Sequence, residues 1–293
     1  MKAFVFPGQG SQFPGMGYDL YKSNEKVKSL FNEADDVLGF ALSNVMFNGN
    51  EKELKQTKIT QPAIFLHSIA KLSVLQETHS PSAVAGHSLG EFSSLVANNT
   101  ISFEDGLKLV SLRSKAMQKS GESSNGTMAA ILGLDDKTIK ETCESFDGNV
   151  TAANFNCPGQ VVISGELNAV KKICEKFNEI GARRSILLPV GGAFHSNLMN
   201  DAKSELKEAI HKTKFNNPSC PIYQNFTAQK TTNIDIIKEN LINQLTAPVL
   251  WTQTINNMVD DGYLDYTEVG PGKVLQGLIR KINRETTTQS VLS

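Results

Sequence analysis

The stretch Gly86-His-Ser-Leu-Gly90 constrains the fold of this chain more than any other feature of its sequence. It follows a short apolar run, residues 82–86, and precedes a helical stretch that extends to about residue 98. A G-x-S-x-G motif between a strand and a helix predicts a tight turn that lifts Ser88 out of an α/β sheet. The alternative is a loop of glycine and serine that only joins two elements, and the motif without this context would favour it.

Strand-like and helix-like stretches alternate in the first part of the chain. Residues 2–6 predict a buried strand, residues 23–38 have apolar side chains at helical spacing, and Pro62 is placed to begin a helix. Repeated strand-to-helix order predicts an α/β domain with a mostly parallel sheet. The last third adds helices at about 197–212, 234–245 and 274–282 and a strand at 263–270. We expect the final polar stretch, 286–290, to fray.

The middle of the chain has a different order of elements. Residues 121–126 are polar and contain glycine, which predicts a linker. From there to residue 190 the predicted order is strand, helix, strand, strand, helix, strand, which is typical of a ferredoxin-like unit. We therefore predict a large α/β domain of residues 1–122 and 191–293, an inserted ferredoxin-like α+β subdomain of residues 123–190, and a ligand cleft between them.

Composition disfavours several classes of protein. The 293 residues are 40% hydrophobic and 20% charged, which predicts a folded chain, and a net charge of -1 gives nucleic-acid binding no support. The four cysteines have no paired spacing, which argues against a zinc site and against a disulfide framework. No targeting pattern or apolar run of membrane-spanning length is visible, so we expect a cytoplasmic protein with no membrane partner.

A serine nucleophile needs a base, and the chain has five histidines. His67 lies among apolar residues of a predicted helix, and His87 is expected to point away from the neighbouring serine. His195 precedes a predicted helix, whose N-terminus disfavours the imidazolium and keeps the ring able to accept a proton. An incidental histidine at a helix start explains the sequence equally well. No acidic residue stands out as the group that orients the ring, and a backbone carbonyl can do so.

Arg113 lies on the apolar face of a predicted helix, with Leu109, Val110 and Met117 within one turn. A charge in this position is costly unless it is paired. In the structural interpretation, the partner of Arg113 is a buried carboxylate of the protein itself, and these residues favour this interpretation slightly. The functional interpretation is a carboxylate of the substrate, bound by both arms of the guanidinium.

The segment 6–15, FPGQGSQFPG, has glycines at 8 and 10 that let backbone amides approach a ligand. It lacks the third glycine and the Lys-Ser/Thr of phosphate-binding loops, so a nucleotide site is disfavoured. Because the segment ends a strand of the same predicted sheet as Ser88, Gln9 is a candidate for one contact to a transient oxyanion. The N–H of Leu89, the residue after the nucleophile, is the other.

These motifs occur together in a known family. FPGQGSQ, GHSLGE, LRSKAMQ, NFNCPGQVVISG, GGAFHS, APVLW and YTEVGPGKVLQGL stand in the order found in malonyl-CoA:acyl carrier protein transacylases, which the chain resembles over essentially its whole length. The resemblance implies an α/β-hydrolase-like large domain with an inserted ferredoxin-like subdomain. It also implies a ping-pong acyltransferase of fatty acid biosynthesis, in which malonyl-CoA acylates a serine and the phosphopantetheine thiol of acyl carrier protein then takes the malonyl group.

The resemblance also assigns roles to residues. It implies Ser88 as the nucleophile, His195 as its base, the amides of Gln9 and Leu89 as oxyanion donors, Arg113 as the malonate-binding residue and Leu250 as the residue whose main-chain carbonyl orients the histidine. Three further residues are placed near the substrate, namely Phe194, Asn154 and Asn156. Because a phenylalanine beside the base would crowd an α-methyl group, we expect malonyl to be preferred over methylmalonyl.

The expected partners follow from this reaction. They are malonyl-CoA and acyl carrier protein, with no metal and no cofactor beyond the CoA thioester substrate, and with the enzyme as a monomer. Carrier proteins are acidic, so a basic patch is expected from Lys115, Lys119, Arg183 and Arg184. The alternatives are a polyketide-pathway acyltransferase with another acyl group or carrier, a serine thioesterase or other hydrolase, and a catalytically inactive protein that binds carrier protein.

Overall fold

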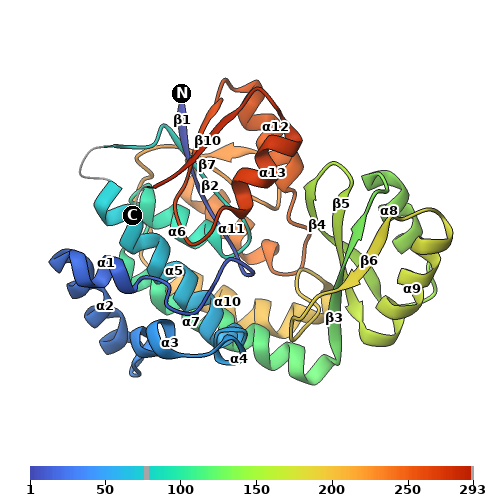
Figure 1. Cartoon of the computed structure of the whole chain (residues 1–293), viewed down its shortest axis with the longest axis horizontal. Helices are drawn as coiled ribbons and strands as arrows, with labels where there is room; N and C mark the ends of the chain where they lie inside the picture. The colour runs from blue at the N-terminus through green and yellow to red at the C-terminus, as the bar shows by residue number, and fades with distance from the viewer. Residues whose placement is uncertain (76–78, 292–293) are drawn as a thin grey trace.

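The computed structural model describes residues 1–75 and 79–291 and arranges the strands in two separate sheets (Figure 1). The larger sheet has the order β10-β9-β1-β2-β7-β8. Its strands are β1 (Lys2–Phe6), β2 (Ala83–Gly86), β7 (Ile222–Tyr223), β8 (Lys230–Thr231), β9 (Asp265–Glu268) and β10 (Thr287–Ser290). All neighbours run parallel except β7 and β8. The predicted mostly parallel α/β sheet is thereby confirmed.

Helices cover both faces of this sheet. They are α1 (Tyr18–Ser23), α2 (Glu25–Leu38), α3 (Leu42–Asn48), α4 (Glu51–Leu54), α5 (Thr57–Leu75), α6 (Gly90–Ala97), α7 (Phe103–Ser124), η1 (Asn197–Met199), α10 (Asn200–Lys212), α11 (Ile234–Gln244), α12 (Trp251–Asp260) and α13 (Val274–Ile282). Side chains alternate along β1, so Phe4 and Phe6 join the core of α2, α5 and α7, whereas Ala3 and Val5 join that of α12 and α13. Within the described ranges, no helix is long and apolar enough to span a bilayer.

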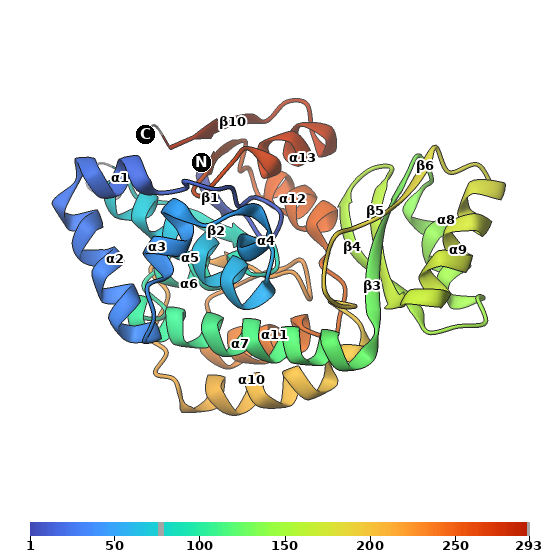
Figure 2. The same ribbon diagram turned by 60° about the horizontal axis from the view of Figure 1, so that its bottom comes forward.

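The second sheet is antiparallel, with the order β4-β5-β3-β6. Its elements follow one another as β3 (Gly126–Leu132), α8 (Asp136–Glu144), β4 (Val150–Cys157), β5 (Gln160–Glu166), α9 (Leu167–Glu179) and β6 (Arg184–Leu187). Both helices lie on one face, where a separate apolar core forms around Ile131, Ile163 and Phe177 (Figure 2). This order and connectivity are those of the predicted ferredoxin-like unit.

The chain enters the small sheet directly from a helix. The predicted linker at 121–126 is wrong for most of its length, because α7 continues to Ser124 and only Asn125, with φ 45°, breaks the helix before β3. The predicted boundary at residue 122 thus falls inside α7, and the domain limits stay a prediction. Val249 makes a second connection: its N–H donates to Ala153 and its carbonyl accepts from Phe155 on β4 (2.9 Å each).

Two other local predictions were wrong. Pro62 does not begin a helix, because α5 begins at Thr57 and Pro62 lies inside it. The stretch predicted to fray contains β10, which pairs in parallel with β9. Side chains hold it there, since Gln276 donates to Ser290 (2.7 Å) and Gln289 donates to Thr267 (3.1 Å).

Candidate active site

Three adjacent parallel strands place the residues of the candidate site. β1, β2 and β7 are neighbours in the sheet, and their carboxyl ends meet at one edge. The segments that follow them carry Gln9, Ser88 and Asn225 respectively. Ligands of parallel α/β sheets commonly bind at this edge.

The predicted tight turn lies between β2 and α6. Ser88 has φ 52°, a left-handed conformation that is unfavourable for a residue with a Cβ atom. The two glycines of the motif are needed because the backbone crosses itself closely: a Cβ on Gly86 would lie 1.9 Å from the carbonyl carbon of Gly90, and one on Gly90 would lie 2.1 Å from Phe6 O. The turn lifts the Ser88 side chain to the start of α6.

His195 lies against this serine. Its Nε2 is 2.8 Å from Ser88 Oγ, and its Nδ1 is 2.9 Å from the main-chain carbonyl oxygen of Gln244. A carbonyl only accepts, so the proton of the neutral ring lies on Nδ1 and Nε2 is free to accept from the serine hydroxyl. The predicted role of the Leu250 carbonyl is wrong, because that oxygen accepts the N–H and the hydroxyl of Thr254 at the start of α12.

The surroundings keep His195 neutral. The side chain is buried, and burial, followed by the nearby positive charge of Arg113, lowers the pKa of His195 to about 3. A neutral imidazole is the form that accepts a proton. The ring is therefore in its basic form over the whole physiological pH range.

Arg113 is completely buried and reaches the same serine. Its Nη2 donates to Ser88 Oγ and to Gln244 Oε1 (3.0 Å each), and its Nη1 donates to Gln61 Oε1 at 2.7 Å. Its Nε is buried without a hydrogen-bond partner. Burial lowers the pKa of the guanidinium to about 10, so it remains charged at pH 7. Among residues 1–75 and 79–291, no carboxylate lies within salt-bridge distance of Arg113. The buried carboxyl group of Glu91 interacts with the guanidinium electrostatically, without a direct ion pair.

The amides predicted as oxyanion donors flank the nucleophile. Neither the N–H of Gln9 nor that of Leu89 bonds to another group in the part of the chain that the structure describes. The N–H of Ser88 itself is taken, because it donates to Asn225 Oδ1 at 2.7 Å. Two free amides beside a serine suit a negative charge that forms on an attacked carbonyl oxygen.

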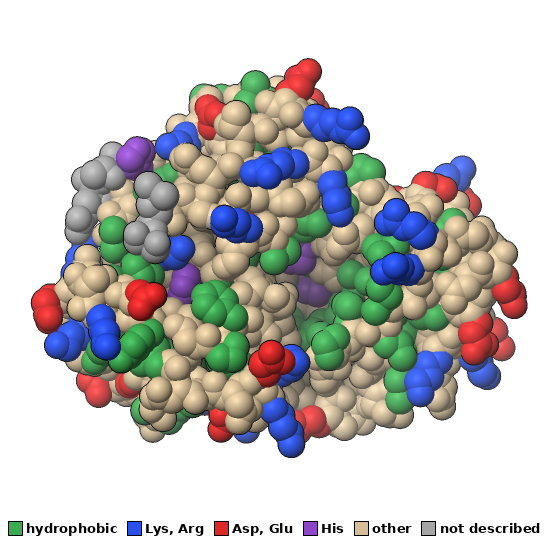
Figure 3. All heavy atoms as spheres, viewed as in Figure 1, with side chains coloured by type: hydrophobic (Ala, Val, Ile, Leu, Met, Phe, Trp, Pro, Cys, Tyr) green, Lys and Arg blue, Asp and Glu red, His purple; other side chains and the backbone are tan. Residues whose placement is uncertain are grey.

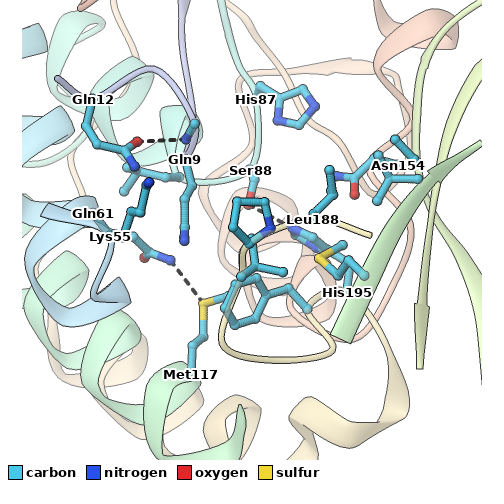
Figure 4. A pocket seen from close by; sticks show the side chains of 18 of the residues that line it. Gln9, Gln12, Lys55, Gln61, His87, Ser88, Met117, Asn154, Leu188 and His195 are labelled. Carbon is cyan, nitrogen blue, oxygen red and sulfur yellow. Dashed lines mark hydrogen bonds between the residues drawn. The ribbon is translucent and has the colours of Figure 1, made fainter. Parts of the chain in front are cut away.

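A cavity of about 530 Å³ opens above Ser88 and is lined from both sheets. Figure 3 shows it as a hollow between the two parts of the molecule, with histidine and hydrophobic side chains inside it. Close up, Gln9 and Gln61 lie on one side of Ser88, and Leu188 and Asn154 lie on the other (Figure 4). The lining also includes Phe194, Asn156, Met117, Met128 and Val162.

His87 points away from the neighbouring serine, as predicted. Its Nε2 lies 2.8 Å from Asn156 Oδ1 on β4 and its ring contacts that of Trp251, while the residue still lines the cavity. Asn154 contributes backbone at the same strand, through a bridge to Val249. The two asparagines thus lie where the small sheet meets the turn of the nucleophile.

Sequence reasoning missed four buried polar residues of the site, namely Gln61, Glu91, Asn225 and Gln244. Gln244 contacts all three main residues of the site. Its Nε2 donates to Ser88 O (3.0 Å), its Oε1 accepts from Arg113 and its main-chain oxygen accepts from His195. The available signal was a polar side chain within an apolar helical stretch, as for Gln61 in α5. The described residues contain no cluster of three or more His, Cys, Asp or Glu suited to a metal ion.

Comparisons with known proteins identify the family. The acyl transferase domain family matches residues 3–292. A malonyl CoA-acyl carrier protein transacylase of Bacillus subtilis (strain 168) is 43% identical over 293 residues, covering 99% of this chain and 92% of the relative. One of Staphylococcus aureus (strain MRSA252) is 40% identical over 292 residues, covering 99% and 94%.

Solved structures agree with these relatives. The crystal structure of an acyl carrier protein S-malonyltransferase from Vibrio cholerae has a TM-score of 0.94 at 40% identity, covering 99% of this chain and 96% of that one. A malonyl-transacylase solved in complex with a type II polyketide acyl-carrier protein has a TM-score of 0.94 at 38% identity, covering 99% and 94%. This chain belongs to the acyl transferase family and, within it, to the malonyl CoA-acyl carrier protein transacylases.

Proposed function

We propose that this enzyme moves a malonyl group from malonyl-CoA to the phosphopantetheine thiol of acyl carrier protein, through an ester on Ser88, and so supplies fatty acid biosynthesis. The observation that supports it best is the meeting of Ser88, His195 and Arg113. Arg113 is a fully buried cation that forms no direct salt bridge with a carboxylate of the described residues, and its Nη2 lies 3.0 Å from Ser88 Oγ. In a malonyl ester the free carboxylate is only one methylene away from the ester carbon, so it can neutralise this guanidinium.

Acylation uses the neutral imidazole. Ser88 Oγ attacks the thioester carbonyl carbon while its proton passes to Nε2 of His195, 2.8 Å away. The carbonyl oxygen becomes negative and is stabilised by the N–H groups of Gln9 and Leu89. When the carbon–sulfur bond breaks, His195 returns its proton to the departing CoA sulfur.

Transfer repeats these steps with a different thiol. The pantetheine sulfur attacks the Ser88 ester, its proton passes to His195, and the bond between Oγ and the malonyl carbon breaks. His195 then gives the proton back to Ser88 Oγ, and the enzyme is restored. One thioester is consumed, another is formed, the CoA thiol is released and the enzyme is regenerated, so the proposed reaction requires no cofactor.

The rate at which the acyl-enzyme loses its malonyl group, with and without carrier protein, distinguishes transfer from hydrolysis. Acyl-enzyme made with malonyl-CoA is mixed with holo acyl carrier protein of fatty acid or polyketide synthesis, or with buffer alone, and loss of the adduct is followed. We expect rapid transfer to a carrier protein and slow loss in buffer. Equal rates with and without carrier protein would show a thioesterase instead.

Phe194 supports a preference for malonyl over methylmalonyl groups. It lines the cavity next to His195 and is itself almost buried, so an α-methyl group of the substrate has little room. One methyl group is worth about 1–3 kcal/mol in such a pocket, or about 10- to 200-fold in kcat/KM. Equal kcat/KM for malonyl-CoA and methylmalonyl-CoA would contradict this role.

Docking of an acidic carrier protein is the proposed role of Arg183 and Arg184, two exposed residues at the start of β6. Neither forms an ion pair with an acidic residue of the described chain, so both charges are available to a partner. Lys119 is less suited, because it lies 3.6 Å from Glu205. A cytoplasmic location for the reaction stays a prediction from the sequence.

A further inference from the structure

We propose that Asn225 is a positioning residue, which holds the Ser88 turn and decides which backbone amides face the reacting carbonyl. The inference rests on the proposed role of Ser88 as the nucleophile. Asn225 follows β7, the neighbour of β2, and is completely buried. Asn225 does not line the cavity, so it can affect the reaction only through the residues that it contacts.

The side chain of Asn225 forms hydrogen bonds with the backbone on both sides of His87. Its Oδ1 accepts from the N–H of Ser88 and its Nδ2 donates to the carbonyl of Gly86, each at 2.7 Å. One planar amide therefore connects the residue before His87 with the residue after it. Because Ser88 is held at φ 52°, a conformation disfavoured for serine, the turn needs such an external tie to persist.

The orientation of this amide is fixed by its surroundings. The N–H of Asn225 donates to Glu91 Oε1, its carbonyl accepts from Leu250 N (3.1 Å), and Gln244 Nε2 approaches Oδ1 at 3.4 Å. A rotated amide would set its NH₂ against the N–H of Ser88 and its oxygen against Gly86 O. Both contacts would then be repulsive, so only the observed orientation satisfies all groups.

The consequence concerns the oxyanion. With the N–H of Ser88 directed at Asn225, the amides left free beside the nucleophile are those of Leu89 and Gln9. Without Asn225, the Ser88 amide is an unpaired donor and the turn can relax toward a common backbone conformation. Relaxation of the turn would move Oγ away from His195, and a misplacement of about 1 Å costs about 100-fold in rate.

The test measures how fast Ser88 reacts with phenylmethylsulfonyl fluoride, an electrophile without a malonyl group. A bond forms between Oγ and sulfur, the sulfur–fluorine bond breaks, and the hydroxyl proton passes to His195. This labelling reports on the nucleophile even if the proposed acyl substrate is wrong. We expect Asn225→Ala to label about 100-fold more slowly than wild type.

Asn98→Ala is the matched control. Asn98 is also completely buried, its Nδ2 donates to Cys220 O (3.1 Å) and its Oδ1 accepts from Thr100, but it lies at the opposite end of α6. Its loss costs a comparable set of buried hydrogen bonds without touching the turn. We expect it to lower the melting temperature while labelling within about threefold of wild type, well below the unfolding temperature.

Asn225→Asp separates positioning from stability. A protonated aspartic acid has the shape of asparagine and can donate to Gly86 O, whereas the carboxylate cannot. The ionisable groups around this position are Glu91, Arg113 and His195, so wild type is measured at each pH as the reference. Relative to wild type, labelling of Asn225→Asp should recover at least tenfold between pH 8 and pH 5, and that of Asn225→Ala should not.

These outcomes decide the proposal. Slow labelling of Asn225→Ala, normal labelling of Asn98→Ala and acid recovery of Asn225→Asp support it. Labelling of folded Asn225→Ala within threefold of wild type overturns it, as does an Asp variant that labels as slowly relative to wild type at pH 5 as at pH 8. If Asn225→Ala does not fold, the pH dependence of the Asp variant alone gives the answer.

Discussion

The two sheets of this enzyme bury different kinds of side chain. The small sheet has an apolar core, built from residues such as Ile131, Ile163 and Phe177. Beside the large sheet, Arg113 and Asn225 are fully buried around the nucleophile. Of the non-glycine residues described with positive φ, none lies within the strands and helices of the small sheet, whereas Ser88 and His195 both belong to the site.

This difference indicates that the two parts of the molecule have different roles in the reaction. Strained backbone and desolvated charge are costly and persist where the surrounding fold compensates for them. The large sheet has helices on both faces and supplies that support. The small sheet contributes one wall of the cavity and an exposed surface, neither of which requires strain. Changes on the large-sheet side should therefore affect chemistry and binding of the acyl group, and changes on the small-sheet side should affect docking of the carrier protein.

The largest expected effect is that of His195→Ala. Without Nε2 no group accepts the Ser88 proton, so we expect kcat for malonyl transfer to fall by about 1000-fold with little change in KM. Asn156→Ala, on the small-sheet side of the cavity, is the comparison and should lose far less. Similar losses in the two variants would contradict this difference in roles.

Arg113→Ala should have the next largest effect. Loss of the charge-assisted contact to the substrate carboxylate should lower kcat/KM for malonyl-CoA by about 100-fold. Acetyl-CoA has no carboxylate, so its kcat/KM should not fall and the preference for malonyl should disappear. Steady-state rates with both thioesters check this, and a retained malonyl preference would contradict the role of Arg113.

A smaller effect is expected from charge reversal on the small-sheet side. Arg183→Glu combined with Arg184→Glu should raise KM for acyl carrier protein about fivefold while kcat stays the same, since each exposed charge pair contributes little. Lys137→Glu is the control, because Lys137 lies on α8 and is already 3.8 Å from Glu141. An unchanged KM in the double variant would remove these arginines from the docking surface.

The smallest effect is expected from pH. Since the pKa of His195 is lowered from 6.5 to about 3, the base stays unprotonated as the pH falls through 6.5. Protonation would remove the lone pair that accepts the serine proton, so His195 should cause activity to fall only as the pH approaches 3. The pH profile of kcat/KM checks this. The contradicting result is a kcat/KM that falls with a midpoint near pH 6.5 while the stability of the protein stays constant over that range. It would show that the base titrates like an ordinary exposed histidine.

Local sequence patterns predicted much of this architecture. The features that were missed depend on contacts between residues far apart in the sequence. The strand-to-helix context of Gly86–Gly90 predicted the turn, and the order of elements predicted the ferredoxin-like sheet. The assignment of Leu250 failed because a carbonyl that orients a histidine leaves no mark in the sequence, and Gln244 provides it. β10 was missed because its polar side chains are ordered by distant partners on β9 and α13.

The proximity of Ser88, His195 and Arg113 is best tested by the intact mass of the protein after incubation with malonyl-CoA. Wild type should gain the mass of one malonyl group, located by peptide mapping on Ser88, and Ser88→Ala should gain none. Addition of holo acyl carrier protein should then remove the adduct. An adduct that persists in Ser88→Ala, or its absence from folded wild type, would contradict a covalent malonyl-serine mechanism at this site.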